Sequence, residues 1–303
     1  MDQTTYPSLI QLGPYATLIV ALIVALWGRA LISWGLLAAL LVWSISVELV
    51  SPLGAVFVLA LCAAALGWKS ISKTPPTHGN TPAPTLKRRA LSVASFSLLF
   101  ILSVLFLIHK VPGFKNTELL APMTLGHAAG EYYLRMALDK PLFALVILAA
   151  GLIAIPSIRP QEIIAKTVQP MFVTLGVVLG VGLLAGFIAW DPKMPPELML
   201  WAGSNFFFTC LAEEIFFRGL IQERAQQLLS KVNYGPLIAV TLTAALFGVS
   251  HAAGGAVYVL MVFLAGLGYG WTYYRTRSII AATGVHFVLN ITHLLLFTYP
   301  HAV

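Results

Sequence analysis

Residues 201–221 read WAGSNFFFTCLAEEIFFRGLI, and this apolar run contains three charged side chains, Glu213, Glu214 and Arg218. A charge at membrane depth costs about 2.5–3.5 kcal/mol on insertion scales, so it persists only if it is paired, faces a wet cavity or does chemistry. On a helix, Glu214 and Arg218 are four residues apart and can pair on one face. Glu213 is rotated by about 100° from Glu214 and has no partner in this segment. We therefore predict that Glu213 is a functional carboxylate; the structural alternative is a Glu–Arg bridge beside one snorkelling glutamate.

The composition of the whole chain indicates a membrane protein. Of its 303 residues, 59% are hydrophobic and 10% are charged, whereas an ordinary soluble domain is about 25% charged. Because backbone groups in lipid must be satisfied internally, helices are the expected spanning elements. We predict an all-α, polytopic, multi-pass protein of the bacterial inner (plasma) membrane, with about ten transmembrane helices and a C-terminal catalytic bundle. The net charge of +7 resides in short basic loops that orient membrane proteins, and it does not indicate nucleic-acid binding.

Apolar stretches give the predicted spans: residues 14–27, 30–48, 53–68, 90–109, 141–155, 170–190, a central helix from 198 past Arg218, 236–251, 257–274 and 279–297. Residues 69–89 are basic and Pro/Thr-rich, which predicts a flexible cytoplasmic linker. Residues 130–141 predict an amphipathic segment at the membrane interface. The predicted domains are a three-span unit (1–68), the linker (69–89) and a membrane domain (90–303) with its motif core at 198–297.

Three of the last four predicted spans contain polar side chains with catalytic potential. His251 follows Phe247 by four residues, and His286 precedes Asn290 by four, so each pair shares a helix face. A buried carboxylate such as Glu213 can act as general base on a water, and a histidine can hold that water. A histidine and an asparagine on one face supply the donors that an oxyanion hole needs. The same Glu/His/His set could instead bind zinc, and sequence spacing does not separate the two possibilities.

The predicted positions of the two histidines conflict with straight, upright spans. At 1.5 Å per residue, His286 lies about 10 Å from the cytoplasmic end of its span, and His251 lies about 24 Å from its own. Helix tilt, a re-entrant end at residues 252–255 (AAGG), or different helix boundaries would be needed to bring them together.

The motifs EExxxR (213–218), FxxxH (247–251) and HxxxN (286–290), in this order within apolar segments, resemble those of the CPBP family of glutamic-type intramembrane proteases. That family includes CAAX prenyl endopeptidases and bacteriocin-processing proteins. The resemblance covers about residues 198–297 and marks 90–303 as a CPBP-like membrane protease domain. It implies that Glu213 activates the hydrolytic water and His251 positions it. It further implies that His286 and Asn290 stabilise the oxyanion. Glu214 and Arg218 would fix the geometry.

The sequence therefore predicts an intramembrane endopeptidase that acts on a membrane-anchored protein or peptide within the lipid bilayer, without a cofactor. A zinc-dependent version of the same protease is the nearest alternative. A non-catalytic membrane scaffold or regulator with this fold is a second alternative. A transporter with Glu213 as proton relay is a third, but it predicts repeated halves, and the sequence shows no internal repeat.

Overall fold

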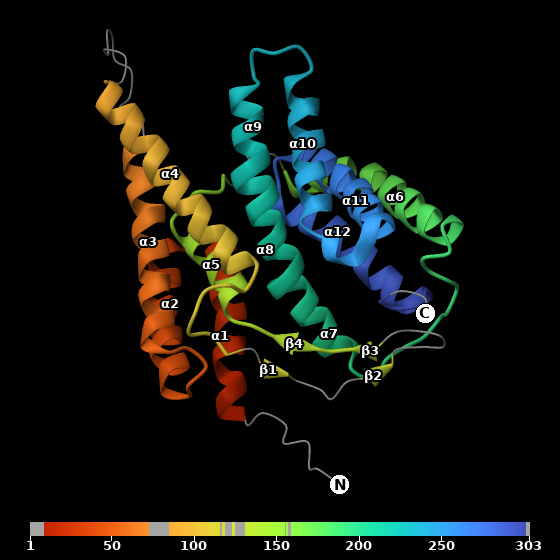
Figure 1. Cartoon of the computed structure of the whole chain (residues 1–303), viewed down its shortest axis with the longest axis horizontal. Coiled ribbons are helices and arrows are strands. Elements are labelled where there is room, and N and C mark those ends of the chain that lie inside the picture. The colour runs from red at the N-terminus through yellow and green to blue at the C-terminus, as the bar shows by residue number, and fades with distance from the viewer. Residues whose placement is uncertain are drawn as a thin grey trace. The chain divides into compact units, whose positions relative to one another are not determined.

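The computed structural model describes residues 9–72, 85–115, 117–118, 123–124, 131–154, 156 and 159–300, and these residues are mostly helical (Figure 1). Contacts group the described parts of 7–117 and 137–153 into one compact unit, the N-terminal unit, and those of 118–136 and 154–303 into another, the C-terminal unit. This grouping differs from the predicted domains, whose boundaries remain a prediction. Most of the predicted linker, residues 73–84, lies outside the described residues.

The N-terminal unit is a bundle of α-helices. Its helices are α1 (Leu9–Leu26), α2 (Ala30–Ser46), α3 (Pro52–Ser72), α4 (Leu86–Leu107) and α5 (Asp139–Ala149). Helix α4 begins where the Thr85 side chain accepts a hydrogen bond from the backbone N–H of Arg88, which satisfies one of the unpaired donors at a helix start. Helix α5 packs against α1, α2, α3 and α4, so its apolar side chains are buried on nearly all sides.

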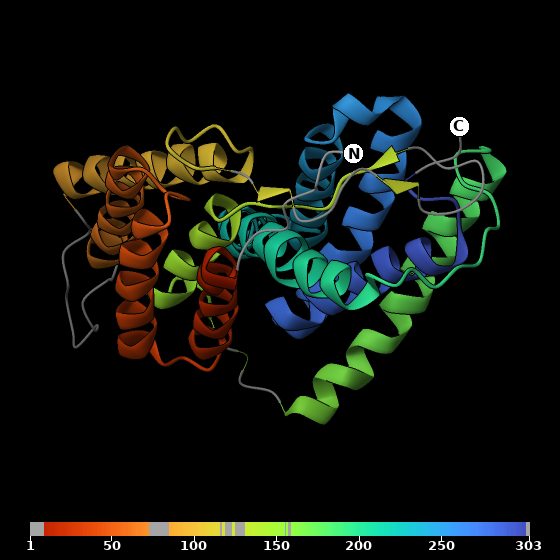
Figure 2. The ribbon, with the colours of Figure 1, turned by 90° about the horizontal axis from the view of Figure 1, so that it is seen from below.

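The C-terminal unit contains the predicted motif core. Its elements are β2 (Met123–Thr124), β3 (Glu131–Tyr132), β4 (Arg135–Met136), α6 (Pro160–Leu184), α7 (Leu198–Ser204), α8 (Leu211–Glu214), α9 (Glu223–Leu228), α10 (Gly235–Val249), α11 (Gly255–Thr276) and α12 (Ile279–Leu296). The remaining strand, β1, is Thr117–Glu118. Strands β2 and β3 pair antiparallel. Helix α11 packs against α6, α10 and α12, and α6 also contacts α12. Figure 2 shows α6 (green) beside these blue helices.

Within the described residues, five segments are long and apolar enough to cross a membrane: Pro52–Ser72, Leu86–Leu107, Pro160–Leu184, Ala252–Thr276 and Ile279–Leu296. Three further apolar helices are shorter: Ile10–Leu26, Ala30–Ser46 and Gly235–Val249. The all-α membrane fold is therefore supported, whereas the predicted number of ten spanning helices is not confirmed.

Three predicted segments differ from the structure. Helix α5 has 11 residues, about 16 Å, and is too short for the predicted span at 141–155 because the hydrocarbon core is about 30 Å thick. Helix α6 begins at Pro160 rather than 170, with Pro170 inside it, and ends at Leu184 rather than 190. The third segment, the amphipathic one predicted at 130–141, has two short strands in its described part, β3 and β4, before the start of α5, and an all-α fold does not include these strands.

The central helix is continuous but not uniformly α-helical. Between α7 and α9 it contains two π-helical segments, Asn205–Cys210 and Ile215–Gln222, on either side of the four residues of α8. A π-turn widens the helix by closing i→i+5 hydrogen bonds, and such turns occur often at functional sites. The two segments flank the Glu-Glu pair, so they determine which side chains of this helix lie next to one another.

The turn after α10 contains His251, one of the two histidines that straight, upright spans would keep apart. Helix α10 has 15 residues, or about 22 Å, and His251 follows it after Ser250. A 3₁₀ turn at Ala252–Gly254 then leads into α11. Gly255 has φ +86°, a conformation that a residue with a Cβ rarely adopts, and this glycine allows the chain to reverse. The residues of this turn are exposed, so the structure does not show a re-entrant end inside the bundle.

Candidate active site

The predicted pair of Glu214 and Arg218 is formed and fully buried. Arg218 Nε donates to Glu214 Oε2 at 2.9 Å, and neither side chain is exposed to solvent. The guanidinium carbon of Arg218 also lies 5.3 Å from the ring centre of Phe247 and 5.8 Å from that of Tyr269. Both terminal nitrogens of Arg218 lack a hydrogen-bond partner within the described part of the chain. The two rings therefore supply the remaining stabilisation of the buried cation.

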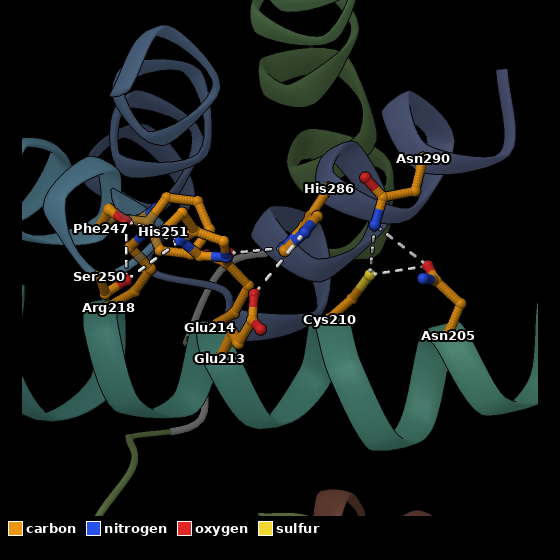
Figure 3. A network of polar contacts seen from close by, with 10 residues as sticks. All are labelled: Asn205, Cys210, Glu213, Glu214, Arg218, Phe247, Ser250, His251, His286 and Asn290. Atoms are coloured by element: carbon orange, nitrogen blue, oxygen red, sulfur yellow. Dashed lines mark hydrogen bonds and ion pairs between the residues drawn. The ribbon is translucent and has the colours of Figure 1, made fainter. Parts of the chain in front are cut away.

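His286 joins the two glutamates (Figure 3). Its Nδ1 lies 3.0 Å from Glu214 Oε1, and its Nε2 lies 3.9 Å from Glu213 Oε2. Because Glu214 is already paired with a cation, its carboxylate accepts and Nδ1 of His286 donates. The apolar segment around Glu213 contains no residue predicted to pair with it, and the structure places His286, on α12, 3.9 Å from it. His286 thus contacts both carboxylates, which the helix-face argument could not show.

His251 is held by the backbone of its own helix. Its Nδ1 lies 2.8 Å from the carbonyl oxygen of Phe247, and the Ser250 hydroxyl donates to the same oxygen at 2.8 Å. A carbonyl oxygen only accepts, so Nδ1 carries the proton and Nε2 of the neutral ring keeps its lone pair. The ring of Phe247 lies 4.9 Å from the ring of His251 and 5.9 Å from that of His286. Phe247 therefore lies against both histidines, and an orienting role for Phe247 stays a prediction.

Asn290 belongs to a cluster that the sequence did not reveal. Its Nδ2 donates to Asn205 Oδ1 at 3.2 Å and lies 3.5 Å from Cys210 Sγ. The thiol of Cys210 donates to the same Asn205 oxygen at 3.1 Å. Figure 3 shows this triangle at one end of the site, on the side of His286 away from His251. An asparagine between two phenylalanines and a serine carries no sequence signal, and only the fold places Asn205 beside Asn290.

All four predicted catalytic residues line one cavity of about 220 Å³. Glu213 comes from the central helix, His251 follows α10, and His286 and Asn290 come from α12. The rest of the lining is largely apolar and comes mainly from α6 and α11. The side chain of Glu213 is 9% exposed and that of His286 is 6% exposed. A buried cavity with a few convergent polar groups is the usual form of an active site.

Tyr299 and Pro300 complete the cavity beyond the end of α12. The ring of Tyr299 lies 5.2 Å from that of His293 and 5.9 Å from that of Trp201. Burial raises the pKa of the Tyr299 phenol well above its ordinary value, so this wall of the cavity stays neutral.

Zinc binding would require three or four ligand side chains to meet at one point. Among the described residues, no group of three His, Cys, Asp or Glu side chains is arranged to hold a metal ion. Glu213, Glu214 and His286 approach each other closely, but one carboxylate is occupied by Arg218.

Comparison with curated proteins and with solved structures finds no significant match. Comparison with protein families finds one: residues 195–292 match the model of the Rce1-like type II CAAX prenyl endopeptidases. The matched segment contains the whole central helix from α7 onward, α10, α11 and most of α12. It therefore includes most residues of the candidate site. The cavity-lining residues that it leaves out belong to α6 and the loop after it, and to 293–300. The match confirms, for residues 195–292, the predicted resemblance of this chain to the CPBP family of intramembrane proteases.

Proposed function

We propose that this protein is an intramembrane endopeptidase that hydrolyses a peptide bond in a membrane-anchored protein or peptide by direct attack of water. One observation carries the proposal. The cavity collects Glu213, His251, His286 and Asn290 from three separate helical segments, and the family match covers all of them. A polar cluster at membrane depth is costly, and a purely structural ion pair would need only Glu214 and Arg218.

Glu213 and His251 are the residues proposed to activate the water. Glu213 faces the cavity, and its Oε2 is too far from His286 Nε2, at 3.9 Å, for a direct hydrogen bond. His251 presents the lone pair of Nε2, since its Nδ1 is engaged by the Phe247 carbonyl. A water in the cavity can donate one hydrogen to each of these acceptors, which aims its oxygen lone pair at a substrate carbonyl. Glu213 then takes the proton as general base and returns it to the leaving amine.

His286 and Asn290 are proposed to stabilise the oxyanion. Glu214 fixes Nδ1 of His286, so Nε2 is the nitrogen that faces Glu213 and the cavity. A protonated His286 makes the buried set neutral, because it and Arg218 then balance the charges of Glu213 and Glu214. The N–H groups of His286 and Asn290 would donate to the negative oxygen that develops during attack. No covalent intermediate is required.

The substrate class follows from the site's surroundings. Helices α6, α11 and α12 contribute to the lining of the cavity, and each includes a segment long and apolar enough to cross a membrane. A substrate must therefore reach the cavity from within or beside the bilayer. The matched family is named for prenylated CAAX substrates, and a lipid-anchored peptide is the first substrate to test. The number of spans and the bacterial plasma membrane remain predictions.

The test uses the full-length protein, purified in detergent, with a panel of lipid-anchored and transmembrane peptides as substrates. Cleavage that persists with a strong chelator is the expected result. Loss of cleavage in the chelator, restored by zinc, would replace the proposed mechanism with its metal-dependent alternative. Absence of cleavage across the panel, with folded protein, would favour the non-catalytic scaffold.

A further inference from the structure

The first π-helical segment places Asn205 next to Cys210. In an α-helix, residues five apart are about 140° apart around the axis, because each residue turns by about 100°. A π-turn closes i→i+5 bonds and so stacks residues five apart. The Cys210 thiol consequently reaches Asn205 Oδ1 at 3.1 Å. Asn205 also lines the cavity that contains Glu213.

The hydrogen bonds of this cluster fix the orientation of the Asn290 amide. Two donors, the thiol of Cys210 and Nδ2 of Asn290, converge on the single oxygen Oδ1 of Asn205. The three atoms form a triangle, since Asn290 Nδ2 is also 3.5 Å from the sulfur. One N–H of Asn290 points into this triangle. The planar amide then directs its second N–H away from the triangle, and Asn290 is a lining residue of the cavity.

We propose that Asn205 is a positioning residue for Asn290. The side-chain oxygen of Asn205 holds the Asn290 amide so that one N–H of Asn290 faces the oxyanion. The π-turn places the Asn205 oxygen where it can do this. This inference rests on the proposed function, because it assigns Asn205 a part in the same site. Without the acceptor on Asn205, the amide of Asn290 can rotate or flip, and its carbonyl would then meet the oxyanion. The effect belongs to the transition state, so kcat should change and KM should not.

The kinetic test compares Asn205→Leu, Asn205→Asp and Asn290→Ala in the full-length protein. Asn205→Leu has a similar volume but no acceptor, and we expect kcat to fall by about tenfold or more, within the range for a weakened oxyanion donor. Asn205→Asp keeps an acceptor oxygen and should recover a large part of this loss. Thr243→Val is the matched control, because it removes a buried hydroxyl on α10 that bonds only within its helix and lies outside the cavity lining.

A double-mutant cycle separates positioning from general damage to the fold. If Asn205 acts through Asn290, then adding Asn205→Leu to Asn290→Ala should reduce kcat by less than about twofold, since coupled residues are not additive. Losses that multiply in the double variant would overturn the proposal. A fall in kcat for Asn205→Leu no larger than that for Thr243→Val would overturn it as well.

A spectroscopic test of the same contact does not depend on activity. The chain has two cysteines, Cys62 and Cys210, so a Cys62→Ala background leaves one S–H stretching band. Asn205→Leu should shift this band to higher frequency because the thiol loses its acceptor, whereas Asn205→Asp should not. An unchanged band in Asn205→Leu would contradict the cluster. If wild type cleaves no substrate while the band shifts as expected, the proposed function fails and the contact of Asn205 stands.

Discussion

At the scale of single residues, the buried charges form one unit rather than separate pairs. Removing two charges from water costs several kcal/mol per ion, and close pairing recovers this only when the geometry is good and the other polar atoms are satisfied. Glu214 meets both conditions, because it accepts from Arg218 Nε at 2.9 Å and lies 3.0 Å from His286 Nδ1. Arg218 meets only the first, because its two terminal nitrogens have no hydrogen-bond partner among the described residues. The aromatic rings around Arg218 add a cation–π contribution. The cluster therefore both stabilises the bundle and orients His286.

Arg218→Met should strongly destabilise the protein, because it leaves the buried carboxylate of Glu214 without its cation. Breaking a buried pair from one side costs about 3–5 kcal/mol, and His286 alone cannot replace the lost contacts. Thermal unfolding in detergent measures the effect. Arg224→Met is the control on the same helix, and we expect it to cost less than about 1 kcal/mol as a change near the surface. Equal melting temperatures for the two variants would show that the pair is not structural.

His251→Ala should reduce kcat by about 100-fold or more, since general acid–base groups and the residues that hold their water contribute about 10²–10⁴-fold. KM should change little, because the proposed role concerns the water rather than the substrate. Ser250→Ala is the matched control. It removes the hydroxyl that bonds to the Phe247 carbonyl and lies 3.1 Å from Nδ1 of His251, and it leaves the imidazole with its own bond to that carbonyl. A similar small effect in both variants would remove His251 from the mechanism.

Sequence reasoning at this scale identified the residues whose chemistry is unusual for their surroundings. Glu213, Glu214 and Arg218 stand out because charges are rare in apolar helices. The dual contact of His286 with both glutamates could not be predicted, since it depends on how α12 packs on the central helix. Asn205 gave no signal because an isolated polar residue is common near helix ends and cores alike.

At the scale of helices, the two π-segments could not be read from sequence. The apolar pattern of residues 201–221 suits an α-helix and a π-helix equally, because the run is hydrophobic on all faces. Whether this run forms an α-helix or a π-helix depends on its packing against other helices. The second π-segment contacts α10 and α12. Helix α5 is a similar case, since a short buried helix and a membrane span share the same composition. Only the structure shows that α5 has 11 residues and is therefore a short buried helix rather than a membrane span.

Gly268→Val should destabilise the packing of α11 on α6. A Cβ at Gly268 would overlap the hydroxyl and methyl group of Thr174 on α6, and overpacking of this kind costs about 1–3 kcal/mol. Gly176→Val, on α6, is the matched control, because no described atom lies within 4 Å of a Cβ built there. Thermal unfolding of both variants provides the comparison. A lower melting temperature for the control than for Gly268→Val would contradict the described packing of α6 and α11.

At the scale of the C-terminal unit, basic residues gather at one end of the bundle. Arg277 pairs with Glu223 of α9 at 2.9 Å, and Arg275 donates to Gln169 of α6 at 2.8 Å. The ends of α9 and α11 that carry these residues therefore lie together, beside the N-terminal half of α6. We predict that this end faces the cytoplasm, because basic residues are enriched in cytoplasmic loops. The opposite loop after α6 carries Lys193, which is paired with Asp191 at 3.3 Å.

Cysteine labelling tests this orientation. In a Cys62→Ala background, Ser230→Cys on the α9–α10 turn should react with a membrane-impermeant thiol reagent only from the cytoplasmic side. Met194→Cys, at a side chain that is 74% exposed, should react only from the other side. Cys210 is fully buried and serves as the unreactive control in the parent protein. Labelling of both positions from one side would contradict the predicted topology.

The activity proposed for the whole molecule depends on Glu213, which is proposed to activate the hydrolytic water. The most direct measurement is kcat of Glu213→Gln against a cleaved peptide, with Glu223→Gln as control. Glu223 lies on the same helix and bonds to Tyr273 and Arg277 outside the cavity. We predict that Glu213→Gln lowers kcat by at least about 100-fold with an unchanged melting temperature, while the control stays close to wild type. Cleavage by Glu213→Gln within about twofold of wild type would show that Glu213 does not activate the water.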